Sequence, residues 1–211
     1  MSNSKTYKKL YDILKVYNSK FNLTAIRNFE DYKIKHIEDS KLGLPFVKGR
    51  ILDIGSGAGF PALVLKIERP ELDITMVDSV RKKVDYLNAV IEELELKNIR
   101  AVHSRIEDIK EKESFDTVTA RAVARLNVLA EYALPFVKTG GVFVSYKAEN
   151  CEDEINEAKR AIILLGGKIE RTESIALSED TVRKIIVIRK IKPSPKVYPR
   201  GGNKPRNNPI V

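Results

Sequence analysis

Two hydrophobic patterns alternate along most of this chain: short apolar runs, and longer segments whose apolar residues recur at helical spacing. The short runs predict strands, and they lie at 51–54, 72–78, 99–103, 115–120, 142–147, 168–175 and 183–189. The helical segments between them lie at 62–67, 80–96, 126–137 and 152–165. This alternation predicts an α/β fold with a mainly parallel, seven-stranded sheet covered on both faces. Ligands bind such sheets at the carboxyl ends of the strands.

The two ends of the chain differ from this alternating part. Residues 1–46 carry apolar positions at helical spacing, flanked by lysines, and predict two or three short helices ahead of the sheet. Residues 192–211 are rich in Pro, Gly and Asn, so we expect an extended basic arm or a disordered tail there. The predicted organisation is an N-terminal helical cap (1–46), an α/β domain (47–191) and a basic tail (192–211).

Length and composition exclude several classes of protein. A chain of 211 residues that is 43% hydrophobic suits one core with a small appendage. The single cysteine, Cys151, excludes an internal disulfide, and with only His36 and His103 beside it we expect no metal site. No apolar run approaches the length of a membrane span, and the N-terminal residues lack a continuous apolar segment. We therefore expect a cytoplasmic protein, with no membrane partner.

The charge distribution favours a polyanionic partner. The formal net charge is +9, and residues 189–211 contain seven basic residues and no acidic one. A lysine-rich, soluble surface without any such partner is the alternative explanation for the net charge.

The most informative stretch is 51–60, in which a strand-like run leads into Gly55, Gly57 and Gly59. Glycines at alternate positions allow a sharp turn and let a ligand approach main-chain amides. Phe60 stands where the dinucleotide fingerprint requires a third glycine, which argues against nicotinamide binding. The pattern, which begins at Asp53, resembles the first motif of S-adenosylmethionine-dependent methyltransferases. This resemblance implies a Rossmann-like sheet of seven strands with an N-terminal helical extension, and S-adenosylmethionine as the cofactor.

Asp78 ends the second predicted strand, about 20 residues after the glycine turn. At this spacing a carboxylate can accept hydrogen bonds from a ribose diol. A carboxylate here can also cap the helix predicted at 80–96, and the two roles are compatible.

A family resemblance covers nearly the whole chain and rests on several motifs in combination. The chain resembles the small-subunit ribosomal RNA methyltransferase G family, also called glucose-inhibited division protein B. The matching stretches are Tyr-Asn at 17–18, Asn-Leu-Thr-Ala-Ile-Arg at 22–27, His-Ile-Glu-Asp-Ser at 36–40, 53–61, Asp-Ser at 78–79 with Lys82 and Lys83, Arg-Ile-Glu at 105–107, Arg-Ala-Val-Ala at 121–124, Lys147, and Tyr-Pro-Arg at 198–200. The resemblance implies methylation of guanine N7 in 16S ribosomal RNA, at guanine 527, with the small ribosomal subunit or its RNA as partner. We expect a monomer, although the sequence does not fix the oligomeric state.

The resemblance assigns roles to individual residues. It implies that Gly55 and Phe60 contact the cofactor, that Ile106 and Glu107 lie beside its adenine, and that Arg121 lines the same site. The family pattern is broken at four places: Ala62, Lys83, Ala148 and the segment 201–203. The last difference weakens the expectation of RNA contacts by the tail, because the expected lysine is displaced to Lys204.

The chemistry of methyl transfer limits what the site must contain. Guanine N7 offers a lone pair and no proton, so alignment rather than a general base must supply most of the rate. Arg121 and Lys147, at predicted strand ends, are the catalytic candidates; we expect them to donate to guanine O6, to phosphate or to the cofactor carboxylate, but not to N7. Alternatively, Arg121 forms a surface ion pair with Glu131 or another carboxylate. His36 is interpreted as a surface or packed residue, and the ranking of Asn22 against the two candidates stays open.

RNA binding is expected at the N-terminal helices and the tail. The predicted contacts are Arg27, Lys196, Tyr198, Arg200, Lys204 and Arg206. Two alternatives remain: a methyltransferase of a protein or small molecule, which leaves the basic tail unexplained, and a non-catalytic RNA-binding protein, which leaves Asp53, Asp78 and the glycines unexplained.

Overall fold

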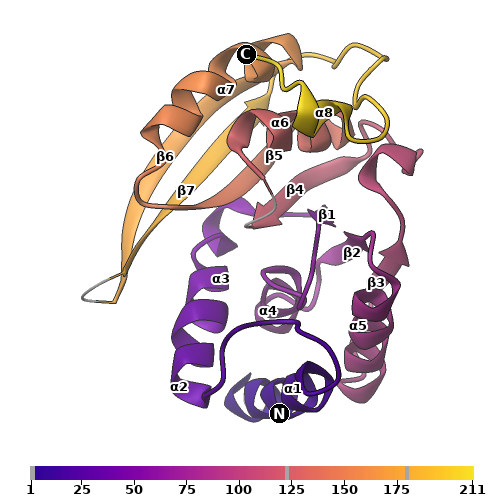
Figure 1. Cartoon of the computed structure of the whole chain (residues 1–211), viewed down its shortest axis with the longest axis vertical. Helices are drawn as coiled ribbons and strands as arrows, with labels where there is room; N and C mark the ends of the chain where they lie inside the picture. The colour runs from indigo at the N-terminus through magenta and orange to yellow at the C-terminus, as the bar shows by residue number, and fades with distance from the viewer. Residues whose placement is uncertain (1–2, 122–123, 179–180) are drawn as a thin grey trace.

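A computed structural model of the chain describes residues 3–121, 124–178 and 181–211. Its centre is a seven-stranded sheet in the order β3-β2-β1-β4-β5-β7-β6 (Figure 1). The first five strands run parallel, and β7 is antiparallel to both β5 and β6. The strands are β1 (Arg50–Ile54), β2 (Asp73–Asp78), β3 (Ile99–His103), β4 (Phe115–Arg121), β5 (Val137–Ala148), β6 (Gly167–Ser178) and β7 (Thr181–Lys190). The predicted fold class, a mainly parallel α/β sheet of seven strands, is confirmed.

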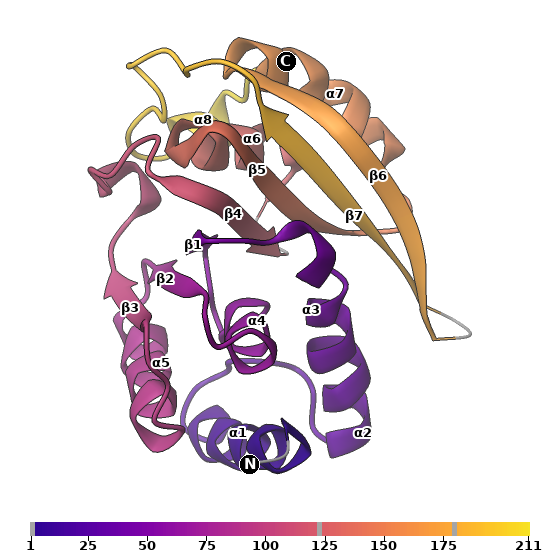
Figure 2. The same cartoon turned by 180° about the vertical axis from the view of Figure 1, so that it is seen from behind.

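Helices cover both faces of the sheet (Figures 1 and 2). One buried cluster joins α1, α4 and α5 to side chains of β1, β2 and β5, and the other joins α6 and α7 to the opposite face. The helices are α1 (Asn3–Asn18), α2 (Phe29–Tyr32), α3 (Asp39–Lys41), α4 (Ala62–Glu68), α5 (Arg81–Glu93), α6 (Leu126–Ala133), α7 (Glu152–Leu164) and α8 (Lys204–Asn207). In the part of the chain that the structure describes, none of them has both the length and the apolar character that a membrane span requires.

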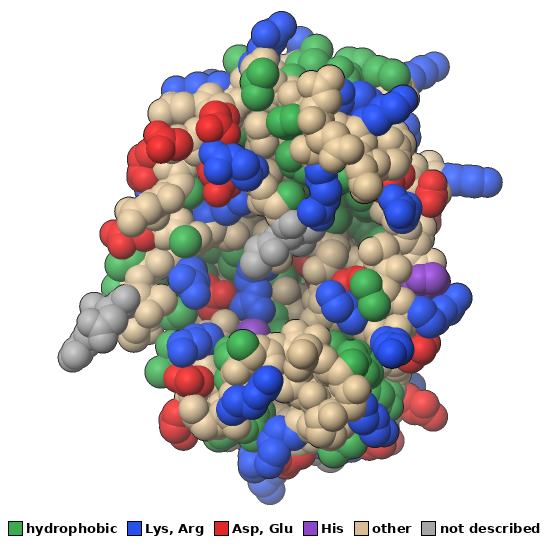
Figure 3. Space-filling view, viewed as in Figure 1, with side chains coloured by type: hydrophobic (Ala, Val, Ile, Leu, Met, Phe, Trp, Pro, Cys, Tyr) green, Lys and Arg blue, Asp and Glu red, His purple; other side chains and the backbone are tan. Residues whose placement is uncertain are grey.

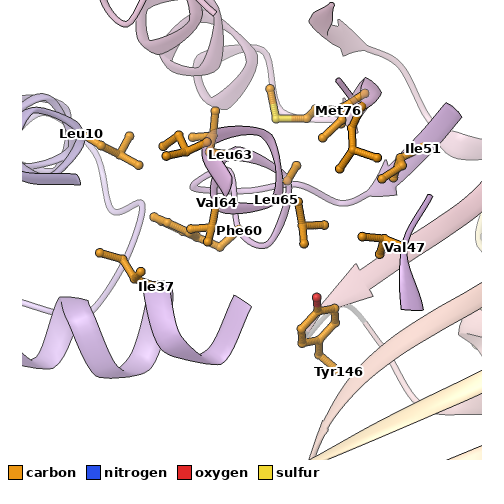
Figure 4. Close-up of a cluster of buried hydrophobic side chains, with 14 of the residues drawn as sticks. Leu10, Ile37, Val47, Ile51, Phe60, Leu63, Val64, Leu65, Met76 and Tyr146 are labelled. Carbon is orange, nitrogen blue, oxygen red and sulfur yellow. The ribbon is translucent and has the colours of Figure 1, made fainter. Parts of the chain in front are cut away.

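The N-terminal residues form α1 and a second helical segment that runs from 29 to 41. The second segment passes from α2 through a π-helical stretch (Lys33–Glu38) into α3. Side chains from both segments meet the helix that follows the glycine turn: Leu10 and Ile37 point toward Phe60 and Val64 in Figure 4. The N-terminal residues are therefore part of the main core.

Two local predictions are wrong. The helix predicted at 126–137 ends at Ala133, and one 3-10 turn (Leu134–Phe136) leads directly into β5. Pro135 accounts for this, because it has no N–H to donate and restricts the residue before it. The tail is also folded rather than disordered or extended, since α8 packs on α6 and Pro205 is buried. Composition alone did not reveal the ion pair, described below, that holds it.

Candidate active site

A pocket of about 660 Å³ lies where β1, β2 and β3 end. The structure brings together in its lining four residues that the sequence analysis assigned to the cofactor: Gly55, Asp78, Ile106 and Glu107. The rest of the lining comes from the ends of β1 and β2, the start of α5, the loop after β3, α6 and the tail: Ile54, Val77, Ser79, Val80, Lys83, Ser104, Arg105, Tyr132, Gly202, Asn203, Arg206 and Asn207. This is the edge at which a parallel sheet binds ligands.

The glycine turn between β1 and α4 forms one side of the pocket. Gly55 has φ +66° and Gly59 has φ +90°, a region that other residues rarely adopt. A side chain at Gly59 would also collide with Leu63 of α4. The turn is thus held tightly against its helix, with the backbone of Gly55 facing the pocket.

Asp78 holds two backbone segments beside the pocket, and its role toward a ribose stays a prediction. One carboxylate oxygen accepts a hydrogen bond from the N–H of Gly57, and the other from the N–H of Val80 ahead of α5, both at 2.9 Å. Lys83 Nζ lies 3.9 Å from the same carboxylate. Asp78 thereby fastens the glycine turn and the start of α5 while it lines the pocket.

Asp53 is the most deeply buried carboxylate near this turn, with 1% of its surface exposed. Its Oδ1 accepts a 2.6 Å hydrogen bond from Thr119 Oγ1 on β4, but its Oδ2 has no partner among the described residues. Burial raises the pKa of Asp53 to about 6. A buried carboxylate oxygen without a partner fits a ligand that brings a cationic or hydrogen-bond-donating group.

Arg121, at the end of β4, reaches across to the N-terminal helical segment instead of entering the pocket lining. Its Nη1 donates to Asp39 Oδ2 at 2.7 Å and to the carbonyl of Lys35, and its Nη2 donates to His36 Nδ1 at 2.9 Å. Asp39 also accepts a hydrogen bond from Arg183 on β7. The alternative of a surface ion pair with Glu131 or another carboxylate is wrong in two respects: the partner of Arg121 is Asp39 and not Glu131, and the pair is largely buried.

The geometry fixes the protonation of His36. Arginine can only donate, so Nδ1 of His36 is the acceptor and Nε2 carries the proton that it donates to Thr24 Oγ1, 3.0 Å away. Burial, together with the charge of Arg121, lowers the pKa of His36 to about 3. The interpretation of His36 as a packed residue agrees with this structure. Its partner Thr24, and Asp39, which binds Arg121, lie in the family motifs at 22–27 and 36–40, but the sequence assigned neither residue a role of its own.

Phe60 does not line the pocket. Its side chain is buried, stacked on His36 and edge-on to Tyr32, and the guanidinium of Arg121 lies 5.5 Å from its ring centre. A contact between Phe60 and the cofactor stays a prediction.

Lys147, the other catalytic candidate, is held by structural partners. Its Nζ donates to Glu154 on α7 and to the carbonyl of Ala124, each at 2.6 Å, and the same Glu154 oxygen accepts the N–H of Leu126 at the start of α6. Ala122 and Val123 of the Arg-Ala-Val-Ala motif lie outside the described residues. Asn22 is exposed, whereas Asn18 accepts two backbone hydrogen bonds from the loop that follows it and so shapes that loop.

The predicted RNA contacts fall into two groups. Arg27, Lys196 and Lys204 are exposed, and Tyr198 is partly exposed. Arg200 is bound to Glu131, and Arg206 belongs to the pocket lining.

A parallel sheet with an antiparallel seventh strand, a glycine turn after β1 and an acidic residue ending β2 together define the class of Rossmann-like methyltransferases. Solved structures with this fold include M. jannaschii TYW2 in complex with AdoMet (TM-score 0.60, 19% identity, 81% of each chain). A putative methyltransferase in complex with the Haloferax volcanii Trm112 activator has a TM-score of 0.61 at 15% identity, covering 77% of this chain and 93% of that one.

The chain belongs to the GidB family, rRNA small subunit methyltransferase G, whose family model matches residues 3–185. Ribosomal RNA small subunit methyltransferase G of Lachnoclostridium phytofermentans is 44% identical over 95% of this chain and 87% of its own length. The Bacillus subtilis protein of the same name gives the same three values. The predictions of the family and of a methyltransferase are confirmed. So is the coarser prediction of small-subunit ribosomal RNA as substrate.

Proposed function

We propose that this protein transfers the methyl group of S-adenosylmethionine to N7 of a guanine in 16S ribosomal RNA, at the position of guanine 527. The pocket beside the glycine turn is the cofactor site in this proposal. The observation that carries it is Asp53: its unpartnered, buried Oδ2 lies beside the turn and suits the ammonium group of a methionine moiety. Asp78, in the pocket lining, suits the ribose hydroxyls.

The cofactor supplies an electrophilic methyl group on a sulfonium, so the protein's task is to align the acceptor with it. In the proposal, Ile106 and Glu107 border the adenine end and the backbone of Gly55 borders the methionine end. Within the described part of the chain, Nε and one Nη2 N–H of Arg121 lack hydrogen-bond acceptors. Arg121 is therefore the residue we assign to guanine O6 or to the cofactor carboxylate.

The choice of N7 is supported by the state of His36. A nitrogen that loses a proton on methylation needs a base, whereas N7 has a free lone pair. Both ring nitrogens of His36 are engaged and its pKa is near 3, so it is not a base at neutral pH. An acceptor that needs no deprotonation fits this arrangement.

The RNA surface in this proposal is the face shown in Figure 3. A hollow lies in the middle of that face, with Lys and Arg side chains on its sides. Exposed Arg27 and Lys204 come from the N-terminal part and the tail, and phosphates are their natural partners.

The test is methyl transfer from labelled S-adenosylmethionine to small ribosomal subunits, and separately to naked 16S RNA, from cells that lack this modification. Mass spectrometry of the nucleosides and fragments should find one 7-methylguanosine, at guanine 527. An R121M variant that still binds cofactor serves as the negative control. Label in another nucleoside would contradict the choice of N7, and absence of label despite cofactor binding would contradict the substrate.

A further inference from the structure

The tail forms one wall of the pocket. Gly202, Asn203, Arg206 and Asn207 all belong to its lining, although they lie more than 90 residues beyond Ile106 and Glu107 in the chain. The tail segment that carries α8 lies over α6 in Figures 1 and 2. Glu107, Tyr132 of α6 and Arg206 of the tail line the pocket together; burial and the charge of Glu107 raise the pKa of Tyr132, and Arg206 opposes that rise.

One buried ion pair holds this wall. Glu131 on α6 is fully buried, and its Oε1 accepts hydrogen bonds from the backbone N–H and the Nε of Arg200, both at 2.9 Å. Its Oε2 accepts from Nη2 of Arg200 at 2.7 Å, and Nη2 also donates to the carbonyl of Asn208. A single guanidinium thus joins α6 to both ends of the segment 200–208. Bidentate pairs of this kind are strong and geometrically specific.

The chain leading to this wall is fixed as well. Lys112 Nζ donates to the carbonyls of Lys196 and Tyr198, and the fully buried Lys190 donates to Ser194 Oγ. Pro205 is buried within α8. The tail therefore follows a defined path from β7 to the pocket.

We propose that the segment 200–208 is a wall of the cofactor site, and that Arg200 and Glu131 are positioning residues that hold it against the adenosine half of S-adenosylmethionine. This inference rests on the proposed cofactor pocket. It replaces the RNA contact predicted for Arg200, because that guanidinium is already bound to Glu131. We call the ion pair between Arg200 and Glu131 the anchor. Its loss weakens cofactor binding without removing any side chain that lines the pocket.

Calorimetry with S-adenosylhomocysteine, in the absence of RNA, tests the anchor. The R200M variant should raise the Kd of S-adenosylhomocysteine about 10-fold or more. Methylthioadenosine retains the adenosine half, so its Kd should rise by the same factor. The matched control is R189M, since Arg189 also makes a bidentate pair, with Glu170, but on the β6–β7 side of the sheet. R189M should bind both compounds within about 2-fold of wild type. Equal Kd values for R200M and R189M would overturn the inference.

A second pair of variants keeps the test decisive if R200M does not fold. Asn203 is exposed, lines the pocket and makes no side-chain capping bond, so N203W fills part of the pocket and leaves the anchor intact. V197W adds the same bulk at an exposed tail position outside the lining. N203W should bind both ligands more weakly than wild type, and V197W should bind both with wild-type affinity. Equal affinities of the two variants would overturn the inference. If the wild-type chain itself binds neither ligand, the proposed cofactor pocket is wrong, and the wall with it.

Discussion

The imidazole of His36 lies flat on the ring of Phe60, with ring centres 4.3 Å apart and planes 3° from parallel. His36 comes from the N-terminal helical segment, and Phe60 directly follows the glycine turn. The stack therefore ties the N-terminal segment to the loop beside the pocket. Because Arg121 donates to the same imidazole, the end of β4 joins this contact.

The buried state of His36 predicts a pH dependence of stability. Its pKa is about 3 in the folded protein and near 6.5 when exposed, so the unfolded chain binds more protons between these values. Stability should therefore fall as the pH drops below about 6.5, with a slope of up to about 1.4 kcal/mol per pH unit. Replacing His36 by Phe keeps an aromatic ring beside Phe60 and should remove this component of the slope.

Urea unfolding from pH 5 to 8 measures the effect. The chain has one other histidine, His103, which is exposed, so H103Q is the matched control and should keep the wild-type slope. Identical slopes in H36F and wild type would contradict the assigned protonation of His36.

Asp53 gives a prediction with opposite signs for stability and for binding. Its pKa of about 6 exceeds the value of an exposed Asp, so its contribution to stability is present at low pH and lost as the pH rises through about 6. At pH 8 D53N should be as stable as wild type or up to about 3 kcal/mol more stable. The same variant should bind S-adenosylmethionine about 10-fold or more weakly, since the amide cannot pair with the ammonium.

Thermal unfolding and calorimetry between pH 5 and 8 separate the two effects of D53N. Wild-type affinity should increase as the pH rises through about 6, and D53N should lack that increase. D85N removes an exposed carboxylate of α5 and should change neither quantity. Unchanged cofactor affinity in D53N would refute the role proposed for Asp53.

Lys147 should act through its partners and not on the substrate. Its Nζ connects Ala124 to Glu154, and Glu154 accepts the N–H of Leu126. K147M and E154Q should each lower the free energy of unfolding by about 1–3 kcal/mol and reduce kcat by similar factors. Chemical denaturation and steady-state kinetics at saturating cofactor provide both numbers. A large loss of kcat in K147M with near-normal turnover in E154Q would instead place Lys147 on the substrate.

The sequence predicts the positions of the site residues better than their partners. Asp53, Asp78, Arg121 and Lys147 were all expected near strand ends, because each one follows or ends an apolar run whose length indicates a strand. All four occupy such positions. A local pattern suffices here, because a parallel sheet brings its carboxyl ends to one edge.

The partners depend on contacts between segments that are distant in the sequence. Arg121 pairs with Asp39 across 82 residues, and Arg200 with Glu131 across 69. Nothing in the spacing of these residues selects one carboxylate over another. The tail illustrates the consequence: its Pro and Gly content indicates disorder, but contacts with distant residues, among them Glu131 on α6 and Lys112, fix its path.

The exposed basic residues predict how RNA binding depends on salt. Arg27, Lys196 and Lys204 are exposed and separate from the pocket lining, so their contacts would be to phosphates. Each phosphate contact that is lost should reduce the magnitude of the negative slope of log K against log salt by about 1. It should also weaken binding to all RNA sequences by a similar factor. R27A, K196A and K204A should each show this change in filter binding between about 50 and 200 mM salt.

K159A provides the matched control for these three variants. Lys159 is an exposed lysine of α7, which packs on α6 and β6. Its removal changes the net charge by the same amount, so a purely global charge effect would lower all four slopes equally. We expect K159A to keep the wild-type slope, because contact with phosphates at the proposed surface, and not net charge, sets the number of counterions released. Equal slopes in all four variants would contradict the RNA surface proposed here.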